Sequence, residues 1–180
     1  MIIRCWGSRG SIPVSGRLYQ RYGGNTTCLE IRTKDNNILI VDAGSGIREA
    51  GNALLAEGSL NFTLLLTHAH WDHIMGFPFF KPIYSSKIRM DIRGCPFAQT
   101  SIKKMLSRIM AAPNFPVNYS HIRAKIVYHE TCFKPVYRLG DMLITPIALS
   151  HPNGGTGYKF EEDGKTFIFL TDNELGHRHP

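Results

Sequence analysis

The sequence of 180 residues contains no long apolar run. No stretch approaches the ~18 consecutive apolar residues that a membrane-spanning helix requires. The first ten residues, MIIRCWGSRG, also lack the apolar stretch of a secretory signal, because a charged residue already enters at Arg4. We therefore expect a cytoplasmic protein that does not contact a membrane.

Cysteine is scarce as well, and none of the four cysteines belongs to a C-x-x-C pair. This argues against a cysteine-rich zinc site. Each cysteine lies beside apolar residues, so we expect small buried side chains in a reducing compartment and no structural disulfide. The four residues are Cys5, Cys28, Cys95 and Cys132.

Repeats, low-complexity segments and linkers are also absent, and the length fits one domain over residues 1–180. The formal net charge is +7. A basic surface suits a phosphate-bearing substrate, although an ordinary solvated surface is the simpler explanation. Because lysine and arginine are scattered along the chain, the sequence predicts no nucleic-acid-binding patch and no specific DNA binding.

Short, β-rich apolar runs dominate the sequence, and two segments have helical spacing. Gly58 has the position of a left-handed cap on the first helix, and Asp163-Gly164 is typical of a hairpin turn. Strands that are buried on both faces, together with helices, favour a layered α/β protein. We expect strands at 1–6, 27–32, 37–42, 62–67, 88–93, 122–128, 142–149, 157–161 and 166–170, and helices at 46–56 and 99–110.

The segment FTLLLTHAHWDH carries the strongest chemical pattern, because an apolar strand runs directly into metal-ligand residue types. His68 and His70 are two positions apart, so their imidazoles can point the same way in an extended turn. Asp72 and His73 follow, and their side chains can point towards a second position nearby. Burying four such groups is costly without a compensating ion. A histidine-rich surface turn is the alternative, but the clustering favours a metal site.

Two other predicted strands end in the same residue types. The run ITPIALSH delivers His151, and TFIFLTD delivers Asp172. Ligand crevices of α/β sheets lie beyond the carboxyl ends of strands, so we expect both side chains to converge with the histidine-rich segment. Taken alone, His151 is equally well explained as a loop histidine and Asp172 as a helix N-cap.

These motifs resemble the metallo-β-lactamase superfamily, whose signature H-x-H-x-D-H stands here as residues 68–73. The opening resembles the branch of ribonuclease Z and the cyclic phosphodiesterases. It has a glycine-rich strand and turn, CWGSRGSIP, then the segment Gly24-Asn25-Thr26-Thr27-Cys28-Leu29, and then the turn Asp42-Ala43-Gly44. The resemblance implies an αββα sandwich.

The resemblance also implies two divalent ions, zinc above all, with manganese or iron as alternatives. One ion would be bound by His68, His70 and His151. The other would be bound by Asp72 and His73, and Asp172 would bridge the two.

Two further aspartate roles follow from the same resemblance. Asp72 would help to orient the attacking water, which makes it the expected catalytic residue. Asp42 would lie behind the ligands and orient them, although a turn-forming aspartate explains its position equally well.

The last part of the family fold has no counterpart in this sequence, so we expect a sandwich that is incomplete at its C-terminus. The family has a further ligand histidine on the second metal, well beyond the position of Asp172. His177 and His179 lie too close behind Asp172 to be its natural equivalent.

We expect a metal-dependent phosphodiesterase that uses a metal-bridging hydroxide and acts on a cyclic nucleotide, a cyclic sugar phosphate or RNA. A lactone or thioester hydrolase and a non-catalytic metal-binding or regulatory module are the alternatives, and a homodimer is left open. Trp71 and the phenylalanines of residues 77–80 could contact substrate, but packing is favoured for the phenylalanines. A substrate wall could be formed by Phe115, Tyr119 and His121, with simple packing on the sheet an equally good explanation.

Overall fold

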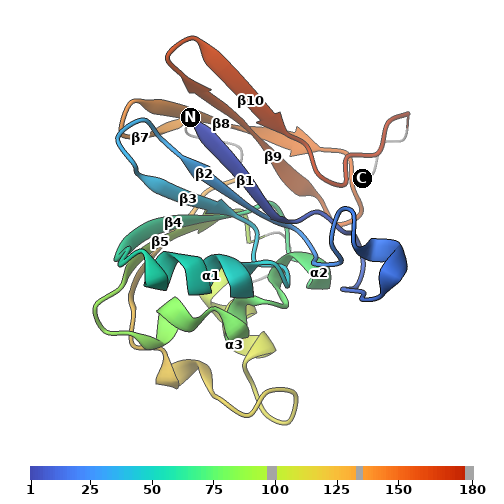
Figure 1. Ribbon diagram of the computed structural model, residues 1–180, viewed down its shortest axis with the longest axis vertical. Coiled ribbons are helices and arrows are strands. Elements are labelled where there is room, and N and C mark those ends of the chain that lie inside the picture. Colours follow the sequence, from blue (N-terminus) through green and yellow to red (C-terminus); the bar gives the residue numbers. More distant parts are fainter. Residues whose placement is uncertain (97–100, 133–135, 177–180) are drawn as a thin grey trace.

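The computed structural model describes residues 1–96, 101–132 and 136–176. Two β-sheets lie face to face, and helices cover the outer face of one of them (Figure 1). The chain completes the first sheet and its helices before it enters the second sheet. The predicted layered α/β architecture is confirmed.

The first sheet has six strands in the order β1-β2-β3-β4-β5-β6. The first three strands are antiparallel neighbours, and β3 to β6 are parallel. Because the four parallel strands point the same way, the residues that follow them emerge at one edge of the sheet. The strands are β1 (Ile2–Gly7), β2 (Cys28–Arg32), β3 (Ile38–Val41), β4 (Asn61–Leu66), β5 (Arg89–Gly94) and β6 (Lys125–Glu130).

The second sheet has four antiparallel strands in the order β10-β9-β8-β7. Its strands alternate in direction, so β8 and β10, which flank β9, end at the same edge. The turn between β9 and β10 is made by Asp163 and Gly164, both at positive φ, as the sequence predicts. The strands are β7 (Tyr137–Leu139), β8 (Met142–Leu149), β9 (Gly155–Glu162) and β10 (Lys165–Phe169).

The helices cover one face of the first sheet and bury the larger of two apolar cores. This core joins α1 to the alternate residues of β4 and β5 that point towards it, such as Leu64 and Ile92. Gly58 ends α1 at φ +74, as predicted. No helix in the described ranges is long and apolar enough to cross a membrane. The helices are α1 (Ile47–Ala56), α2 (Trp71–Ile74), α3 (Ile102–Ile109), η1 (Arg17–Tyr19), η2 (Phe77–Phe79), η3 (Lys81–Tyr84) and η4 (Tyr119–His121).

The second core lies between the two sheets and is built from the opposite faces of the same strands. Leu39, Val41 and Leu65 of the first sheet meet Ile144 and Phe160 of the second. The described residues therefore form three layers, in the order helices, sheet, sheet. They contribute no helical layer on the outer side of the second sheet, so of the αββα sandwich this part of the chain supplies the first three layers.

Element boundaries follow the sequence prediction with a few differences. Strand β7 is not among the predicted strands, because it has only three residues and no apolar run of its own. The strand expected at 122–128 begins later, because residues 119–121 form the turn η4 and Ile122 follows it as a cap. The helix expected at 99–110 is seen as α3 from Ile102, and residues 99 and 100 lie outside the described part.

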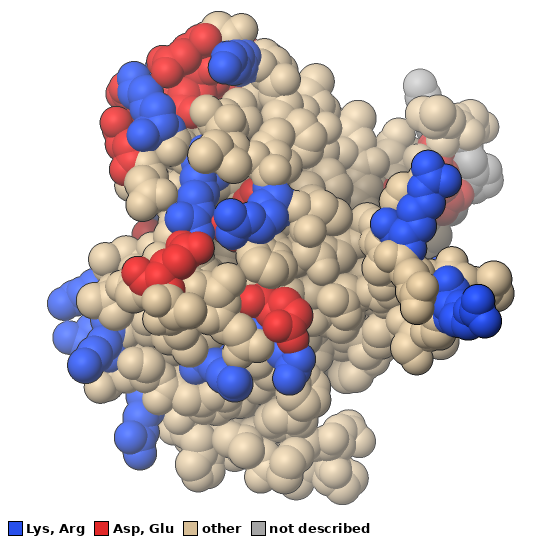
Figure 2. All heavy atoms as spheres, viewed as in Figure 1, with Lys and Arg blue, Asp and Glu red and all other residues tan. Residues whose placement is uncertain are grey.

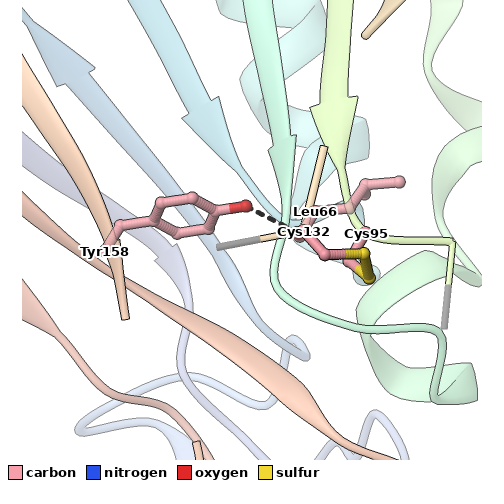
Figure 3. The surroundings of a disulfide bond; sticks show 4 residues. All are labelled: Leu66, Cys95, Cys132 and Tyr158. Atoms are coloured by element: carbon pink, nitrogen blue, oxygen red, sulfur yellow. Dashed lines mark hydrogen bonds between the residues drawn. A yellow bond between two sulfur atoms is a disulfide. The ribbon is translucent and has the colours of Figure 1, made fainter. Parts of the chain in front are cut away.

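The expectations for cysteine were wrong in two respects. Cys95 and Cys132 form a disulfide (Figure 3). They lie just beyond β5 and β6, which are parallel partners with Gly94 opposite Glu130, so the register brings together residues that are 37 positions apart. Cys5 is exposed, because it lies on edge strand β1, and only Cys28 is the free buried cysteine that the sequence predicts.

Candidate metal centre

The end of strand β4 is fixed by the second sheet before the histidine-rich segment begins. The hydroxyl of Tyr158 donates to the carbonyl of Leu66 at 2.9 Å (Figure 3), and the backbone NH of Thr156 donates to the carbonyl of Thr67 at 2.8 Å. Both donors lie on β9. His68 therefore leaves the strand from a position that both sheets determine, and the residue is only 3% exposed.

The next residues turn sharply through the single-turn helix α2. His70 stands at its N-cap in an extended conformation, and Asp72 and His73 lie within the turn. The Asp42-Ala43-Gly44 turn packs directly against this segment. A Cβ at Gly44 would lie 2.4 Å from the carbonyl oxygen of Asp72, so only glycine fits there. The D-x-G motif thus supports the ligand segment sterically.

The second sheet contributes His151 and Asp172, each just beyond the end of its strand. His151 follows β8, and Asp172 follows β10 at φ +60. The two loops are tied to each other, because Ser150 donates its backbone NH to the side chain of Asn173, and Glu174 donates its backbone NH to Ser150. The predicted convergence of three strand ends is thus found, but it spans two sheets instead of one.

Two groups of side chains could each hold an ion, and within each group the ligand atoms lie within 4.8 Å of one another. Oδ2 of Asp172 lies 2.9 Å from Nε2 of His73, 3.4 Å from Nε2 of His68 and 3.9 Å from Nε2 of His151. One carboxylate oxygen thus stands beside members of both groups. The first group is His68, His70 and His151, and the second is His68, His73 and Asp172.

Asp42 lies beneath the site, is fully buried, and accepts hydrogen bonds from two neighbours. Its Oδ1 accepts from the backbone NH of Thr67 at 2.8 Å, and the Thr67 hydroxyl is 2.8 Å from Oδ2. Nδ1 of His73 lies 2.7 Å from Oδ2. A carboxylate at Nδ1 fixes the imidazole so that Nε2 points into the site. Asp42 therefore orients His73, and its place at the end of β3 also makes it a turn residue with φ +64.

The protonation of these groups is set by burial and by the two carboxylates. Burial, with neighbouring imidazoles, lowers the pKa of His68 to about 3 and also lowers the pKa of His70. Burial alone would lower the pKa of His73 too, but Asp42 and Asp172 raise it to about 10. The hydrogen bond from His73 is the main reason that the pKa of Asp172 falls to about 2. Without a metal, a His73 cation thus pairs with Asp172 near neutral pH.

The side chains fit a divalent ion. Nε2 of His68 is buried and has no hydrogen-bond partner among the described residues, a costly arrangement for a polar atom in a folded protein. It faces His70 and His151, whose Nδ1 and Nε2 are 2.9 Å apart. Nitrogen ligands at ~2.0–2.1 Å from a tetrahedral zinc ion would be about 3.3 Å apart, so small side-chain shifts would suffice.

Asp72 lies at the border of the cluster and belongs to neither group of potential ligands. Its Oδ2 is 3.6 Å from Nε2 of His73 and accepts a hydrogen bond from the backbone NH of Ser11 at 2.7 Å. The carboxylate thus stands next to the second group, on the side of the N-terminal segment. Its catalytic and ligand roles stay predictions.

The three residues of the predicted substrate wall have different surroundings, and only Tyr119 and His121 belong to η4. The ring of Phe115 packs edge-on against Phe79 with centroids 5.4 Å apart, and Tyr119 and Tyr128 contact each other through their hydroxyls. Tyr119 lines a pocket that includes Ile122, on the helix side of β6, and none of the six proposed ligands lines it. His121 is exposed.

The aromatic residues beside the ligands divide between packing and exposure. Phe77 and Phe80 are fully buried, as expected, whereas Phe79 and Trp71 are more than half exposed.

Thr67, Ser11 and Glu174 also contact the site side chains, Glu174 through Oε1 at 3.6 Å from Nδ1 of His151. The sequence singled out none of these three. Only Thr67 carries a hint, as the polar residue that directly precedes the motif.

A family model described as the metallo-beta-lactamase superfamily matches residues 21–178. The chain therefore belongs to this superfamily, as its H-x-H-x-D-H motif predicts. No curated protein sequence matches it.

Several solved structures share the fold. YhfI, a metallo-beta-lactamase fold protein from Bacillus subtilis, is 17% identical with a TM-score of 0.64, covering 92% of this chain and 59% of YhfI. A diphosphatase of the PhnP family is 19% identical with a TM-score of 0.63, covering 88% and 61%. The short form of human tRNase Z, ELAC1, is 17% identical with a TM-score of 0.65, covering 97% and 71%. The chain thus spans about three fifths of the first two proteins, and at these identities the likeness establishes the fold alone.

Proposed function

We propose that the protein is a metal-dependent phosphodiesterase that holds two divalent ions, zinc above all, in this centre. The observation that carries the proposal is that Asp172 stands beside both groups of potential ligands and His68 belongs to both. Two sites that share residues lie close enough for both ions to act on one substrate group. The names of two structural neighbours, a diphosphatase and a tRNase, support a phosphate ester as the substrate.

The residues of the chain have separate tasks in this proposal. Asp42 and Thr67 hold His73 with Nε2 facing inwards, and burial keeps His68 and His70 neutral and able to bind an ion. Asp72, held by the backbone NH of Ser11, orients the attacking water. The bound ions would lower the pKa of that water and neutralise charge on the attacked phosphate.

The test is a substrate panel with the zinc-loaded and manganese-loaded protein. Bis(p-nitrophenyl) phosphate, p-nitrophenyl acetate, a homoserine lactone and a β-lactam are compared, each against its own uncatalysed rate. We expect the phosphodiester to be accelerated most, and a chelator to abolish the acceleration. Elemental analysis of the same samples should find one or two ions per chain.

A matched pair of histidine variants makes the test specific. His151→Ala should lose metal and activity, because it removes a proposed ligand. His129→Ala should retain both, because His129 lies on β6 and contacts Asp91 instead of the site. A protein that binds no metal under any loading condition rules out the site assignment. A preference for the lactone or the acetate points to the alternative hydrolase, and metal binding without any hydrolysis points to a binding module.

A further inference from the structure

The N-terminal loop, defined here as residues 8–25, is rich in basic and aromatic side chains and lies beside the metal centre. It holds three arginines, two tyrosines and no acidic residue. The sequence as a whole shows no basic cluster, because these arginines are several positions apart, but the fold gathers them in one projecting loop that carries η1 (Figure 1). The arginines are Arg9, Arg17 and Arg21.

The loop is anchored next to the metal centre. The backbone NH of Ser11 donates to Asp72, and hydrogen bonds from Arg9 to Asn25 and from Val14 to Gly24 close the base of the loop. Trp71, which directly precedes Asp72, is 54% exposed. A substrate held by the proposed ligands would therefore have this loop and an exposed indole as its immediate neighbours.

The charged and aromatic groups of the loop are interleaved, and Arg17, Arg21 and Tyr22 are exposed, whereas the half-buried Arg9 donates to the carbonyl of Ile12. The guanidinium of Arg9 lies over Tyr19 at 5.2 Å, and that of Arg21 lies over Tyr22 at 5.0 Å. In the described part of the chain, no carboxylate forms an ion pair with Arg9, Arg17 or Arg21. Tyr22 is 77% exposed. Basic side chains stand out on the projecting lobe at the right of Figure 2.

We propose that the N-terminal loop binds single-stranded nucleic acid on one side of the phosphodiester that the metal centre cleaves. Arginines without acidic partners attract a polyphosphate backbone, and exposed aromatic rings stack on bases irrespective of sequence. This inference rests on the proposed function and narrows its substrate. A cyclic mononucleotide has one phosphate and one base, and would leave most of these groups unused, whereas a single strand engages several at once.

The test measures binding without hydrolysis. The anisotropy of a fluorescein-labelled, unstructured oligoribonucleotide of about ten nucleotides is followed in chelator, at salt concentrations between about 50 and 200 mM. Arg17→Ala/Arg21→Ala should weaken binding about tenfold or more at low salt and reduce the salt slope by about 0.7 for each phosphate that is no longer neutralised. Tyr22→Ala should weaken binding at least about fivefold, and Tyr22→Phe should restore it, because a ring is what stacking requires.

The matched control is Arg89→Ala/Lys125→Ala, which removes the same charge from the first positions of β5 and β6, at the edge opposite the metal centre. It should bind the oligonucleotide like the wild type. Equal weakening by both double variants shows attraction to net charge alone and overturns the proposal. The proposal is also overturned if the wild-type protein binds anionic phosphatidylserine vesicles through the loop and does not bind the oligonucleotide. The binding test is done without metal, so a failure to bind the oligonucleotide does not bear on the hydrolysis of bis(p-nitrophenyl) phosphate. The further inference and the proposed function can therefore fail separately.

Discussion

Replacing Asp172 with asparagine tests the centre in two states, because the carboxylate has a different partner in each. In the metal-free protein it pairs with the His73 cation. The pKa of Asp172 is lowered from 3.8 to about 2. Because Asp172 is exposed and solvent screens the pairing, this shift corresponds to about 1 kcal/mol of stability at pH values where the carboxylate is ionised and His73 is protonated. Asp172→Asn should therefore lower the melting temperature by about 2–4 °C in chelator.

The pH dependence of this loss follows from the two shifts. Because the pKa of Asp172 is lowered, the stabilisation by its pairing with His73 is present above pH 3.8 and is lost as pH falls through about 2. Because the pKa of His73 is raised, the same stabilisation is complete below pH 6.5 and is lost as pH rises through about 10. The difference between wild type and variant should thus be largest between about pH 4 and 6.5 and small near pH 10.

With zinc in excess the same substitution should cost more. If Asp172 bridges two ions, asparagine offers one poor ligand in place of two charged oxygens, and each tenfold loss of metal affinity adds about 1.4 kcal/mol of lost stability at saturation. Melting curves of the wild type, Asp172→Asn and the exposed-loop control Asp35→Asn, with zinc and with chelator, provide the comparison. An identical loss in both conditions refutes a ligand role and leaves only the pairing with His73.

Three further outcomes are expected. Zinc binding at pH 7.5 should release about one proton, because His73 has a pKa of about 10 and must lose its proton to bind the ion. Calorimetry in two buffers of different ionisation enthalpy measures this release. If no proton is released, the ion does not bind Nε2 of His73. Thr67→Val should destabilise the metal-free protein by about 1–3 kcal/mol in urea titrations, because Asp42 loses a buried hydroxyl partner. Removing the disulfide with Cys95→Ser/Cys132→Ser should cost about 4 kcal/mol for a loop of this length, and a reducing agent should reproduce the loss in the wild type only.

The motif and the strands that carry it could be predicted because they are local. A buried apolar run followed by His68 and His70 is visible in a few consecutive residues. The convergence of His151 and Asp172 on the same centre could also be predicted, since each follows an apolar strand. That these strands belong to a second, antiparallel sheet was implied only by the family resemblance and not by the residues themselves, because strand pairing depends on contacts between distant segments.

Several features that the sequence did not predict depend on such distant contacts. Cys95 and Cys132 become neighbours only through the parallel register of β5 and β6. Ser11 reaches Asp72 through a backbone NH, which has no side-chain signal in the sequence. The pKa of His73 depends on two aspartates from different sheets.

The division of the proposed ligands between the two sheets has a consequence for the order of folding. His68, His70, Asp72 and His73 are available once the first sheet has formed, whereas His151 and Asp172 arrive only when the second sheet docks on it. During refolding an ion would thus be held loosely at first and tightly only after docking. A weak chelator added during refolding would remove the ion only until the two sheets have docked. The time at which the ion becomes resistant to the chelator would therefore report when the interface between the sheets forms, independently of any spectroscopic probe of secondary structure.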